Sequence, residues 1–208
     1  MVKLSGPVLQ ALPARIIALE GIDQSGKRTQ AQLLIGSLKR KGLRAASISF
    51  PVYESPAGQQ IRRFLQGKWS YPPEALHMLY SLNRWENQAR ILSLIQRADF
   101  VVADRYTPSN LAYGVSRGLN LEWLQTLDKG LPVADLVIVL DVPVPSSFAR
   151  KQKNRDVHES NRKLLVKVRH AYKTLSDRLG WKIVDATVPV EEVEPAVWNI
   201  VARKFKLG

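Results

Sequence analysis

Five short apolar runs, each followed by a segment of helical pattern, constrain the fold of this 208-residue chain most strongly. The runs cover residues 15–20, 45–50, 100–104, 136–141 and 181–184. Strands that are apolar throughout are typical of a parallel sheet, because crossover helices cover both of its faces. We therefore expect an α/β fold with three layers, in which a five-stranded parallel sheet has helices on both faces.

The helices between these strands are expected at residues 29–41, 58–65, 74–97, 121–129, 161–179 and 190–205. In the long helix 74–97, we expect Leu79, Leu82 and Leu92 to face the core. Helix 161–179 carries one apolar face at helical spacing. Its members are Leu164, Val168, Ala171, Tyr172, Leu175 and Leu179. Because no repeat or linker divides the chain, residues 1–208 are interpreted as one domain with an N-terminal extension over residues 1–14.

Composition excludes several classes of protein. The chain has no Cys, which excludes disulfides, cysteine-bound zinc and a cysteine nucleophile. No apolar run approaches the about 20 residues of a membrane span. The start of the chain also lacks the pattern of a secretory signal, so we expect a cytoplasmic protein without a membrane partner.

The chain is strongly basic, with 31 Lys and Arg against 18 Asp and Glu and a net charge of +13. Such a charge suits either phosphorylated substrates or a nucleic-acid or acidic membrane surface. The basic residues are spread along the chain instead of forming one dense block. A nucleic-acid partner is therefore not expected, although charge alone does not exclude one.

The segment between the first strand and the first helix has the pattern of a phosphate-binding loop, G-x-x-x-x-G-K. Its residues are Gly21, Ile22, Asp23, Gln24, Ser25, Gly26, Lys27, Arg28 and Thr29. Glycines let the backbone wrap closely around a phosphate, and the following helix contributes the positive end of its dipole. Lys27 would bring a mobile charge to the β- and γ-phosphates. We therefore expect a P-loop fold that binds ATP.

One position in this loop departs from the pattern. The residue after the lysine normally offers a hydroxyl group to Mg²⁺. Here that residue is Arg28, and Thr29 follows it. A guanidinium cannot bind a metal ion, so Arg28 either neutralises phosphate charge or marks weakened catalysis. In a third interpretation, Mg²⁺ is held by water, phosphates and an acidic side chain elsewhere.

Four further segments extend the pattern from residue 16 to the last helix. They are residues 50–51, residues 79–86, residues 102–106 with Ser109, and residues 130–132 with Asp135. Together with the phosphate-binding loop, they make the chain similar to the thymidylate kinase family of P-loop nucleoside-monophosphate kinases. The resemblance implies transfer of the γ-phosphoryl group of ATP to dTMP, giving ADP and dTDP, with Mg²⁺ as cofactor and a homodimer as the assembly.

The same resemblance assigns a base-binding role to the long helix. His77, Tyr80 and Arg84 share one helix face by their spacing. By resemblance, Arg84 contacts the thymine carbonyl, while Tyr80 and Phe50 stack on the two faces of the ring. From the residues alone, Tyr80 as ordinary core and Arg84 as a surface ion pair remain an open alternative.

Asp104 and Arg105 end an apolar strand, at the edge where parallel sheets bind ligands. By resemblance, Arg105 binds the acceptor phosphate, Asp104 organises the metal, and Asp23 accepts a hydrogen bond from the sugar 3′-hydroxyl. The remaining acceptor contacts implied by the resemblance come from Tyr106, Ser109, Asn110 and Tyr113.

Residues 150–160 correspond to the family's mobile lid. Many relatives carry a catalytic arginine either in this lid or in the phosphate-binding loop, and this chain has Val157 and Gln24 at those places. Phosphoryl transfer depends on such charge. Arg150, Arg155 and Arg28 are therefore the remaining candidates.

Two further positions concern the ligands. Tyr53 stands where many relatives place an arginine for the acceptor phosphate, and Arg62 or Arg63 is a candidate substitute. By resemblance, Asp185 and Ala186 border the adenine of ATP.

Two alternatives to a dTMP kinase stay open. One is another nucleoside-monophosphate kinase or a deoxynucleoside kinase on the same scaffold; Arg105 favours an acceptor that already carries a phosphate. The other is a catalytically weakened P-loop module that binds nucleotide or nucleic acid, for which Arg28, Tyr53, Val157 and the charge of +13 are the support.

Overall fold

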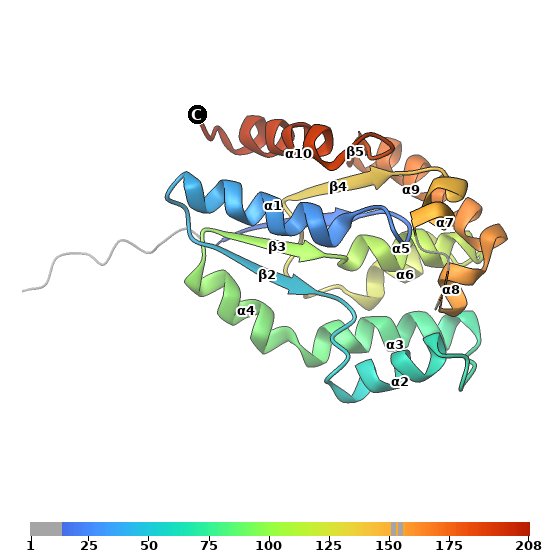
Figure 1. Cartoon of the computed structure of the whole chain (residues 1–208). Helices are drawn as coiled ribbons and strands as arrows, with labels where there is room; N and C mark the ends of the chain where they lie inside the picture. Colours follow the sequence, from blue (N-terminus) through green and yellow to red (C-terminus); the bar gives the residue numbers. More distant parts are fainter. Residues whose placement is uncertain (1–13, 151–152, 154–155) are drawn as a thin grey trace, which may run out of the picture.

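The computed structural model describes residues 14–150, 153 and 156–208. Most of the expected N-terminal extension, and Arg155 of the expected lid, lie outside these residues. Five parallel strands form one sheet in the order β2-β3-β1-β4-β5 (Figure 1). The strands are β1 (Arg15–Glu20), β2 (Ala45–Ser49), β3 (Phe100–Asp104), β4 (Leu136–Asp141) and β5 (Lys182–Asp185). The expected five-stranded parallel α/β fold is confirmed.

Helices pack on both faces of this sheet (Figure 1). The helices of the described residues are α1 (Lys27–Arg40), α2 (Pro56–Leu65), α3 (Pro73–Glu86), α4 (Gln88–Arg97), α5 (Thr107–Ser116), α6 (Leu121–Leu127), α7 (Val144–Arg150), α8 (Val157–Ser160), α9 (Arg162–Leu179) and α10 (Val190–Phe205). Of these, α1, α4, α5, α9 and α10 contact the sheet itself. In the described part of the chain, no helix is both long enough and apolar enough to span a membrane.

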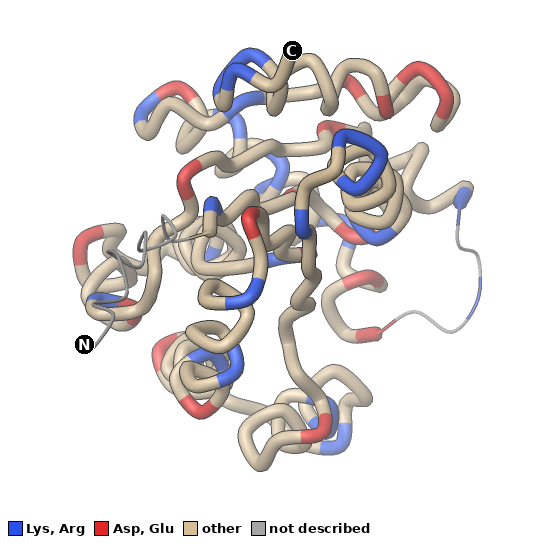
Figure 2. The backbone as a smooth tube through the Cα atoms, turned by 90° about the vertical axis from the view of Figure 1, so that its left-hand side faces the viewer, with Lys and Arg blue, Asp and Glu red and all other residues tan. Residues whose placement is uncertain are grey.

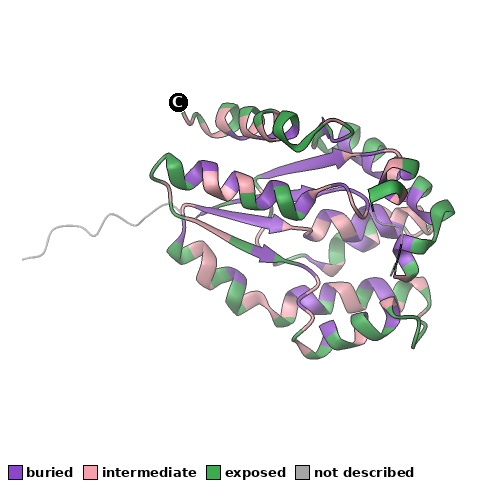
Figure 3. Ribbon diagram, viewed as in Figure 1, coloured by how far each residue is buried: buried purple, intermediate pink, exposed green. Residues whose placement is uncertain are grey.

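The two faces of β1 belong to different cores, because side chains alternate across a strand. Ile17 and Leu19 pack with residues of α1 and α10 on one face. Ile16 and Ala18 pack with residues of α4, α5 and α9 on the other. Figure 3 shows the sheet buried between these helical layers, with exposed residues on their outer sides. Residues at the ends of the central strands are therefore held by packing from both sides.

The expected long helix 74–97 is two helices, α3 and α4, separated at Asn87. The side-chain amide of Asn87 donates to the backbone carbonyl oxygen of Asn83 at 2.8 Å, which stabilises the end of α3. The expectation that Leu82 and Leu92 face the core is wrong, because they are 54% and 43% exposed. The reason is that α3 turns its polar face, with buried His77, inward.

Three helices are additional to those expected from sequence: α5 and α7, which follow the ends of β3 and β4, and α8, which follows α7. The helix α8 has only four residues, so local side-chain contacts stabilise it. Asp156 accepts hydrogen bonds from the amides of His158 and Glu159, each at 2.8 Å, and forms a capping box with Glu159. Because the strands are parallel, α5 and α7 begin at the same sheet edge as the phosphate-binding loop.

Candidate active site

The phosphate-binding loop joins β1 to α1 and depends on two glycines. Gly21 has φ of 134°, and a Cβ atom there would lie 2.5 Å from the carbonyl oxygen of Leu140. Gly26 has φ of 94° and precedes the first turn of α1. Only glycine adopts such backbone conformations without strain. The loop therefore wraps tightly at the N-terminus of α1, where amide groups attract anions.

The ammonium group of Lys27 lies inside this loop. It donates to the carbonyl oxygen of Ile22 at 2.8 Å and to that of Gly21 at 3.3 Å. Burial and then the positive charge of Arg105 lower the pKa of Lys27 to about 8. A phosphate group bound in the loop would compensate this buried charge.

Arg105 connects the loop to the end of β3. Its backbone is left-handed, with φ of 65°, which is strained for a residue with a side chain. Its guanidinium donates to the carbonyl oxygen of Gly21 at 3.1 Å, to Ser109 at 3.2 Å, and to Asp23 in an ion pair. Burial opposes ionisation of Asp23, but the charges of Arg105 and Lys27 outweigh it and lower the pKa of Asp23 to about 2.

Glu20, at the end of β1, supports the segment around Arg105 through buried hydrogen bonds. It was not among the candidates from sequence. Its buried carboxyl group accepts hydrogen bonds from the amide of Tyr106 at 2.8 Å, from Ser109 at 2.6 Å and from Tyr172 at 2.8 Å. Burial raises the pKa of Glu20. The sequence signal was a charged residue at the end of an apolar strand.

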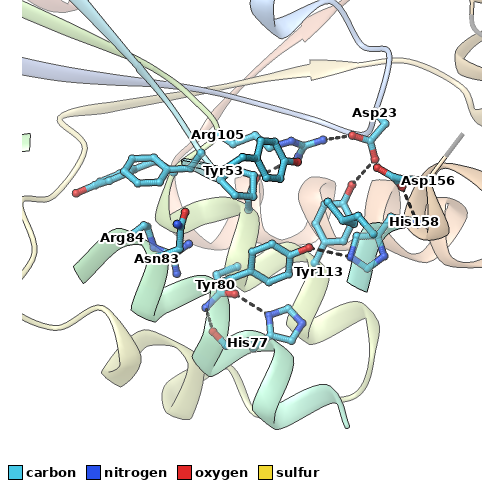
Figure 4. Close-up of a pocket in the computed structure, with 16 residues that line it drawn as sticks. Asp23, Tyr53, His77, Tyr80, Asn83, Arg84, Arg105, Tyr113, Asp156 and His158 are labelled. Carbon is cyan, nitrogen blue, oxygen red and sulfur yellow. Dashed lines mark hydrogen bonds and ion pairs between the residues drawn. The ribbon is translucent and has the colours of Figure 1, made fainter. Parts of the chain in front are cut away.

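A cleft lies beside the loop (Figure 4). The ten side chains expected to contact the acceptor all line it: Asp23, Phe50, Tyr53, Tyr80, Arg84, Arg105, Tyr106, Ser109, Asn110 and Tyr113. Six more residues complete the lining: Pro51, Leu65, His77, Asn83, Asp156 and His158. The phosphate-binding loop and three of the four segments that carry the resemblance thus converge on one cleft, whereas residues 130–132 and Asp135 do not line it.

One wall of the cleft is fixed by a buried ion pair. Arg84 donates to both carboxylate oxygens of Asp128, at 3.0 and 2.7 Å, and both side chains are buried. Ser81 adds a third hydrogen bond to Asp128 at 2.7 Å. Arg84 is therefore not on the surface, which excludes the alternative of a surface ion pair.

The neighbours of Arg84 hold adjacent segments in place. The side chain of Asn83 accepts from the amide of Val52 at 2.9 Å and donates to its carbonyl oxygen at 3.0 Å. The indole of Trp85 donates to the carbonyl oxygen of Leu127 at 2.8 Å. The segment 83–86 therefore acts as a clamp that fixes the chain after β2 and the end of α6.

Arg62 lies beside Tyr53, the residue that stands where many relatives have an arginine. The guanidinium carbon of Arg62 is 5.0 Å from the centroid of the Tyr53 ring, and Tyr53 lines the cleft. Deeper in the cleft, the rings of Phe50 and Tyr106 lie 5.8 Å apart, and the hydroxyl of Tyr106 donates to the carbonyl oxygen of Pro132.

The short helix α8 closes the cleft opposite α3 (Figure 4). The ring of His158 lies 3.2 Å from the hydroxyl of Tyr80 and accepts from Arg117 at 3.0 Å. Burial and then the charge of Arg117 lower the pKa of His158 to about 3. The next residue, Glu159, accepts from the amide of Gln24 at 2.8 Å. Two consecutive residues thus connect α8 to both the acceptor cleft and the phosphate-binding loop.

Arg150, the last residue of α7, also contacts the phosphate-binding loop. It donates to the carbonyl oxygen of Gln24 at 3.1 Å and to that of Ala186 at 2.7 Å. The structure thus brings Arg150, Gln24 and the expected adenine-side turn together, with Asp185 exposed next to Ala186. Arg28 and Thr29 are both exposed in the first turn of α1.

Asp104 ends β3, and its negative charge offsets part of the lowering of the Lys27 pKa that burial and Arg105 cause. Within the described residues, no group of three or more His, Asp and Glu could hold a metal ion by itself. Mg²⁺ in kinases is commonly held by one or two carboxylates together with substrate phosphates and water. A single carboxylate at the sheet edge beside the loop fits that kind of site.

The fold and this site define a P-loop kinase. The sequence model described as thymidylate kinase matches residues 19–197. The thymidylate kinase of Plasmodium falciparum is 34% identical over 190 residues, covering 91% of this chain and 90% of that protein. The human enzyme is 32% identical, covering 86% of this chain and 85% of its own length. The chain belongs to the thymidylate kinase family, whose members phosphorylate dTMP to dTDP.

A solved structure of thymidylate kinase from Candida albicans also aligns with the chain. Its TM-score is 0.80 at 28% identity, and the alignment covers 94% of each chain. This agreement extends the family relationship to the three-dimensional fold.

Proposed function

We propose that this chain transfers the γ-phosphoryl group of ATP to dTMP in the cleft beside the phosphate-binding loop, giving ADP and dTDP. The observation that carries the proposal is Arg105, which contacts the loop at Gly21 and also lines the acceptor cleft. A cation in that place suits an acceptor phosphate facing the donor phosphates. This arrangement favours a monophosphate acceptor over a nucleoside.

At the donor end, Lys27 and the loop amides bind the β- and γ-phosphates and neutralise charge that develops during transfer. Asp104 would hold Mg²⁺ here, and the bound ion would withdraw charge from the phosphates. Arg150 adds charge from the expected lid, residues 150–160. Its hydrogen bond to the carbonyl oxygen of Ala186 places that charge beside the turn that would border the adenine. No covalent intermediate is needed, because positioning and charge neutralisation suffice.

At the acceptor end, Tyr80 and Phe50 stack on the thymine ring, and Arg84 with Ser109 and Asn110 contacts its edge. Asp23 accepts a hydrogen bond from the 3′-hydroxyl of the sugar. Tyr113 supports this role, since its hydroxyl donates to Asp23 at 3.0 Å and keeps the carboxylate directed into the cleft. The whole described chain from residue 14 serves one kinase domain.

The test is a panel of nucleoside monophosphates with ATP and Mg²⁺, followed by coupled detection of ADP. We expect dTMP to be the best acceptor, with Mg²⁺ required. A higher kcat/KM for dCMP, dGMP or a nucleoside would contradict the proposed acceptor. The thymidylate kinase of Candida albicans has broad substrate specificity, so the panel should include dUMP and dGMP.

We also propose a homodimer, formed through the outer face of α3 and α4. Met78 and Leu82 lie one helical turn apart and are exposed, as is Leu92 on α4. An exposed apolar stripe of this kind is typical of an interface. Light scattering after size exclusion should give twice the chain mass, and Leu82→Glu should give a monomer. A monomeric wild-type protein would contradict the assembly without affecting the kinase assignment.

The charge of +13 does not require a nucleic-acid partner under this proposal. Figure 2 shows Lys and Arg distributed over several elements and interspersed with Asp and Glu. Several basic residues are in ion pairs: Arg15 with Asp135, Arg40 with Glu194 and Arg44 with Asp99. Retention of labelled DNA on a filter across a salt series checks this; retention that persists at physiological salt would revive a nucleic-acid function.

A further inference from the structure

The side-chain amide of Asn110 is held at both ends by one residue, His77. The ring nitrogen Nδ1 of His77 lies 2.7 Å from Oδ1 of Asn110. The amide nitrogen of Asn110 donates to the backbone carbonyl oxygen of His77 at 3.3 Å. The two residues come from α3 and α5, both are buried, and both line the acceptor cleft.

These two contacts determine the orientation of the amide and the tautomer of the ring. A backbone carbonyl only accepts, so the NH₂ group of Asn110 must face it. Oδ1 therefore faces the imidazole, and Nδ1 must carry the proton that it donates. Burial lowers the pKa of His77 to about 4, so the ring is neutral near pH 7. Its lone pair is then on Nε2, which has no hydrogen-bond partner among the described residues.

Packing alone does not account for a histidine at this position. A buried ring nitrogen without a partner is unfavourable, and an apolar side chain of similar size would avoid it. The hydrogen bond from Nδ1 to Asn110 is the contact that an apolar residue cannot replace. Figure 4 shows His77 next to Tyr80, on the same helix and in the same cleft.

We propose that His77 is a positioning residue: its ring N–H and its backbone carbonyl together hold the Asn110 amide in one orientation, and the resulting order of donor and acceptor selects the base. Once His77 holds the amide, Oδ1 can still accept one hydrogen bond and Nδ2 can still donate one. That order matches a base with a protonated N3 beside a carbonyl, as in thymine and uracil. Cytosine has an unprotonated N3 beside an amino group and needs the amide reversed. The inference rests on the proposed function, because it concerns the same acceptor site.

The first test measures selectivity in steady-state kinetics with dTMP, dUMP and dCMP at saturating ATP. His77→Phe keeps an aromatic ring and the backbone carbonyl but removes the 2.7 Å contact to Oδ1. The amide is then held only by the longer 3.3 Å bond, so we expect the ratio of kcat/KM for dTMP over dCMP to fall about tenfold or more. The change should appear mainly in KM for dTMP, with KM for ATP unchanged. The ratio of dTMP to dUMP should stay constant, because both bases have the same N3 edge.

The variant His77→Asn separates a positioning role of His77 from a simple loss of packing. The amide of His77→Asn can place an N–H where Nδ1–H stands, so this smaller side chain should restore most of the dTMP over dCMP ratio. His170→Phe on the exposed side of α9 is the matched control and should leave all ratios unchanged. A general loosening of the site would instead be worse in His77→Asn and would change the dUMP ratio too.

A double-mutant cycle tests whether His77 acts through Asn110. Asn110→Ala should lower the same ratio, and adding His77→Phe should lower it no further. Additive losses would overturn the inference. Full selectivity in Asn110→Ala would overturn it too, and that measurement does not depend on a folded His77 variant.

The wild-type enzyme separates the inference from the proposed function. If wild type does not prefer dTMP to dCMP, the proposed function itself fails. If wild type prefers dTMP and His77→Phe is equally selective, only the positioning role of His77 fails.

Discussion

The donor end and the acceptor end of the active site are built in different ways. The donor end consists of consecutive residues between β1 and α1, and Lys27 is held there mainly by backbone carbonyl oxygens. The acceptor end is assembled from side chains of α3, α5, α8 and the segment after β2. One charge therefore dominates the donor end, whereas the acceptor end depends on pairs of side chains that support one another.

The sharpest test of this comparison is Lys27→Met. We expect kcat with ATP and dTMP to fall about 10³-fold, because a preorganised charge on the phosphates is lost. The fold should persist, since Lys27 makes its contacts with loop carbonyls and a nearby hydroxyl. Coupled ADP detection and circular dichroism measure the two effects.

Lys39→Met provides the control at the other, exposed end of the same helix. It should retain wild-type kcat. If Lys27→Met kept activity within tenfold of wild type, a single charge would not dominate the donor end, and the phosphate-binding role of the loop would have to be abandoned.

At the acceptor end, the largest expected effect is on stability. Asp128→Asn leaves the buried guanidinium of Arg84 without a counter-charge, so the free energy of unfolding should fall by about 3 kcal/mol. KM for dTMP should rise as the wall of the cleft loosens. Urea unfolding and steady-state kinetics check the two expectations.

The surface pair of Arg44 and Asp99 gives the matched comparison. Both of these side chains are exposed, so Arg44→Gln should leave the free energy of unfolding nearly unchanged. Equal effects in the buried and surface pairs would mean that the acceptor wall is not held by Arg84 and Asp128.

The same contrast explains how much of the molecule the sequence could predict. The strands and the phosphate-binding loop depend on local order: apolar runs, helical spacing and two glycines within nine residues. Their boundaries differ from the expected ones by one or two residues; for example, α1 begins at Lys27 instead of Thr29. The break at Asn87 was missed because no proline or glycine marks it.

The acceptor cleft was harder to predict, because its contacts join distant parts of the chain. Asp128 lies 44 residues after Arg84, and nothing in its surroundings marks it as the partner. Glu159 reaches Gln24 across 135 residues, through a four-residue helix too short for a periodic pattern. The resemblance supplied which residues gather at the cleft, but the pairing of those residues required the structure.

A pH experiment on stability sharpens the comparison from the donor side. Burial lowers the pKa of Lys27 from 10.5 to about 8, so between these values the unfolded chain binds more protons than the folded protein. Stability from this group must therefore rise with pH across that window. We expect wild-type protein to gain on the order of 2 kcal/mol relative to Lys27→Met. Urea unfolding near pH 7.5 and near pH 10 measures the difference, and a difference that falls with pH would contradict the burial of a charged lysine.

A smaller effect is expected from Arg62, which lies over Tyr53 in the wall of the acceptor cleft. It lies over the ring of Tyr53, where the sequence lacks the usual arginine. Arg62→Ala should raise KM for dTMP about tenfold with little change in kcat, as expected for a partly solvated charge near a phosphate. Arg63→Ala, the neighbouring exposed arginine, is the control. If Arg62→Ala and Arg63→Ala had equal effects on KM for dTMP, the overall positive potential of this surface, and not Arg62 itself, would attract the acceptor phosphate.

The smallest effect concerns Arg28, which occupies the position of the usual metal-binding hydroxyl. Arg28 is exposed in the first turn of α1, where its guanidinium has room to approach a bound phosphate. Neither Gln24 nor Val157 supplies the charge that relatives place there. We therefore expect Arg28→Ser to lower kcat about fivefold, which corresponds to about 1 kcal/mol for two charges 4 Å apart in water.

The opposite result follows if Arg28 only points outward. The serine would then restore a hydroxyl ligand for Mg²⁺, and kcat or metal affinity would rise. Measuring kcat against Mg²⁺ concentration for both proteins separates these outcomes, because a lost phosphate contact lowers kcat even at saturating Mg²⁺. A higher kcat at saturating Mg²⁺ in Arg28→Ser would show that the arginine replaces a metal ligand without serving the donor phosphates. The absence of turnover in wild type at every Mg²⁺ concentration would favour a P-loop module that binds nucleotide without transfer.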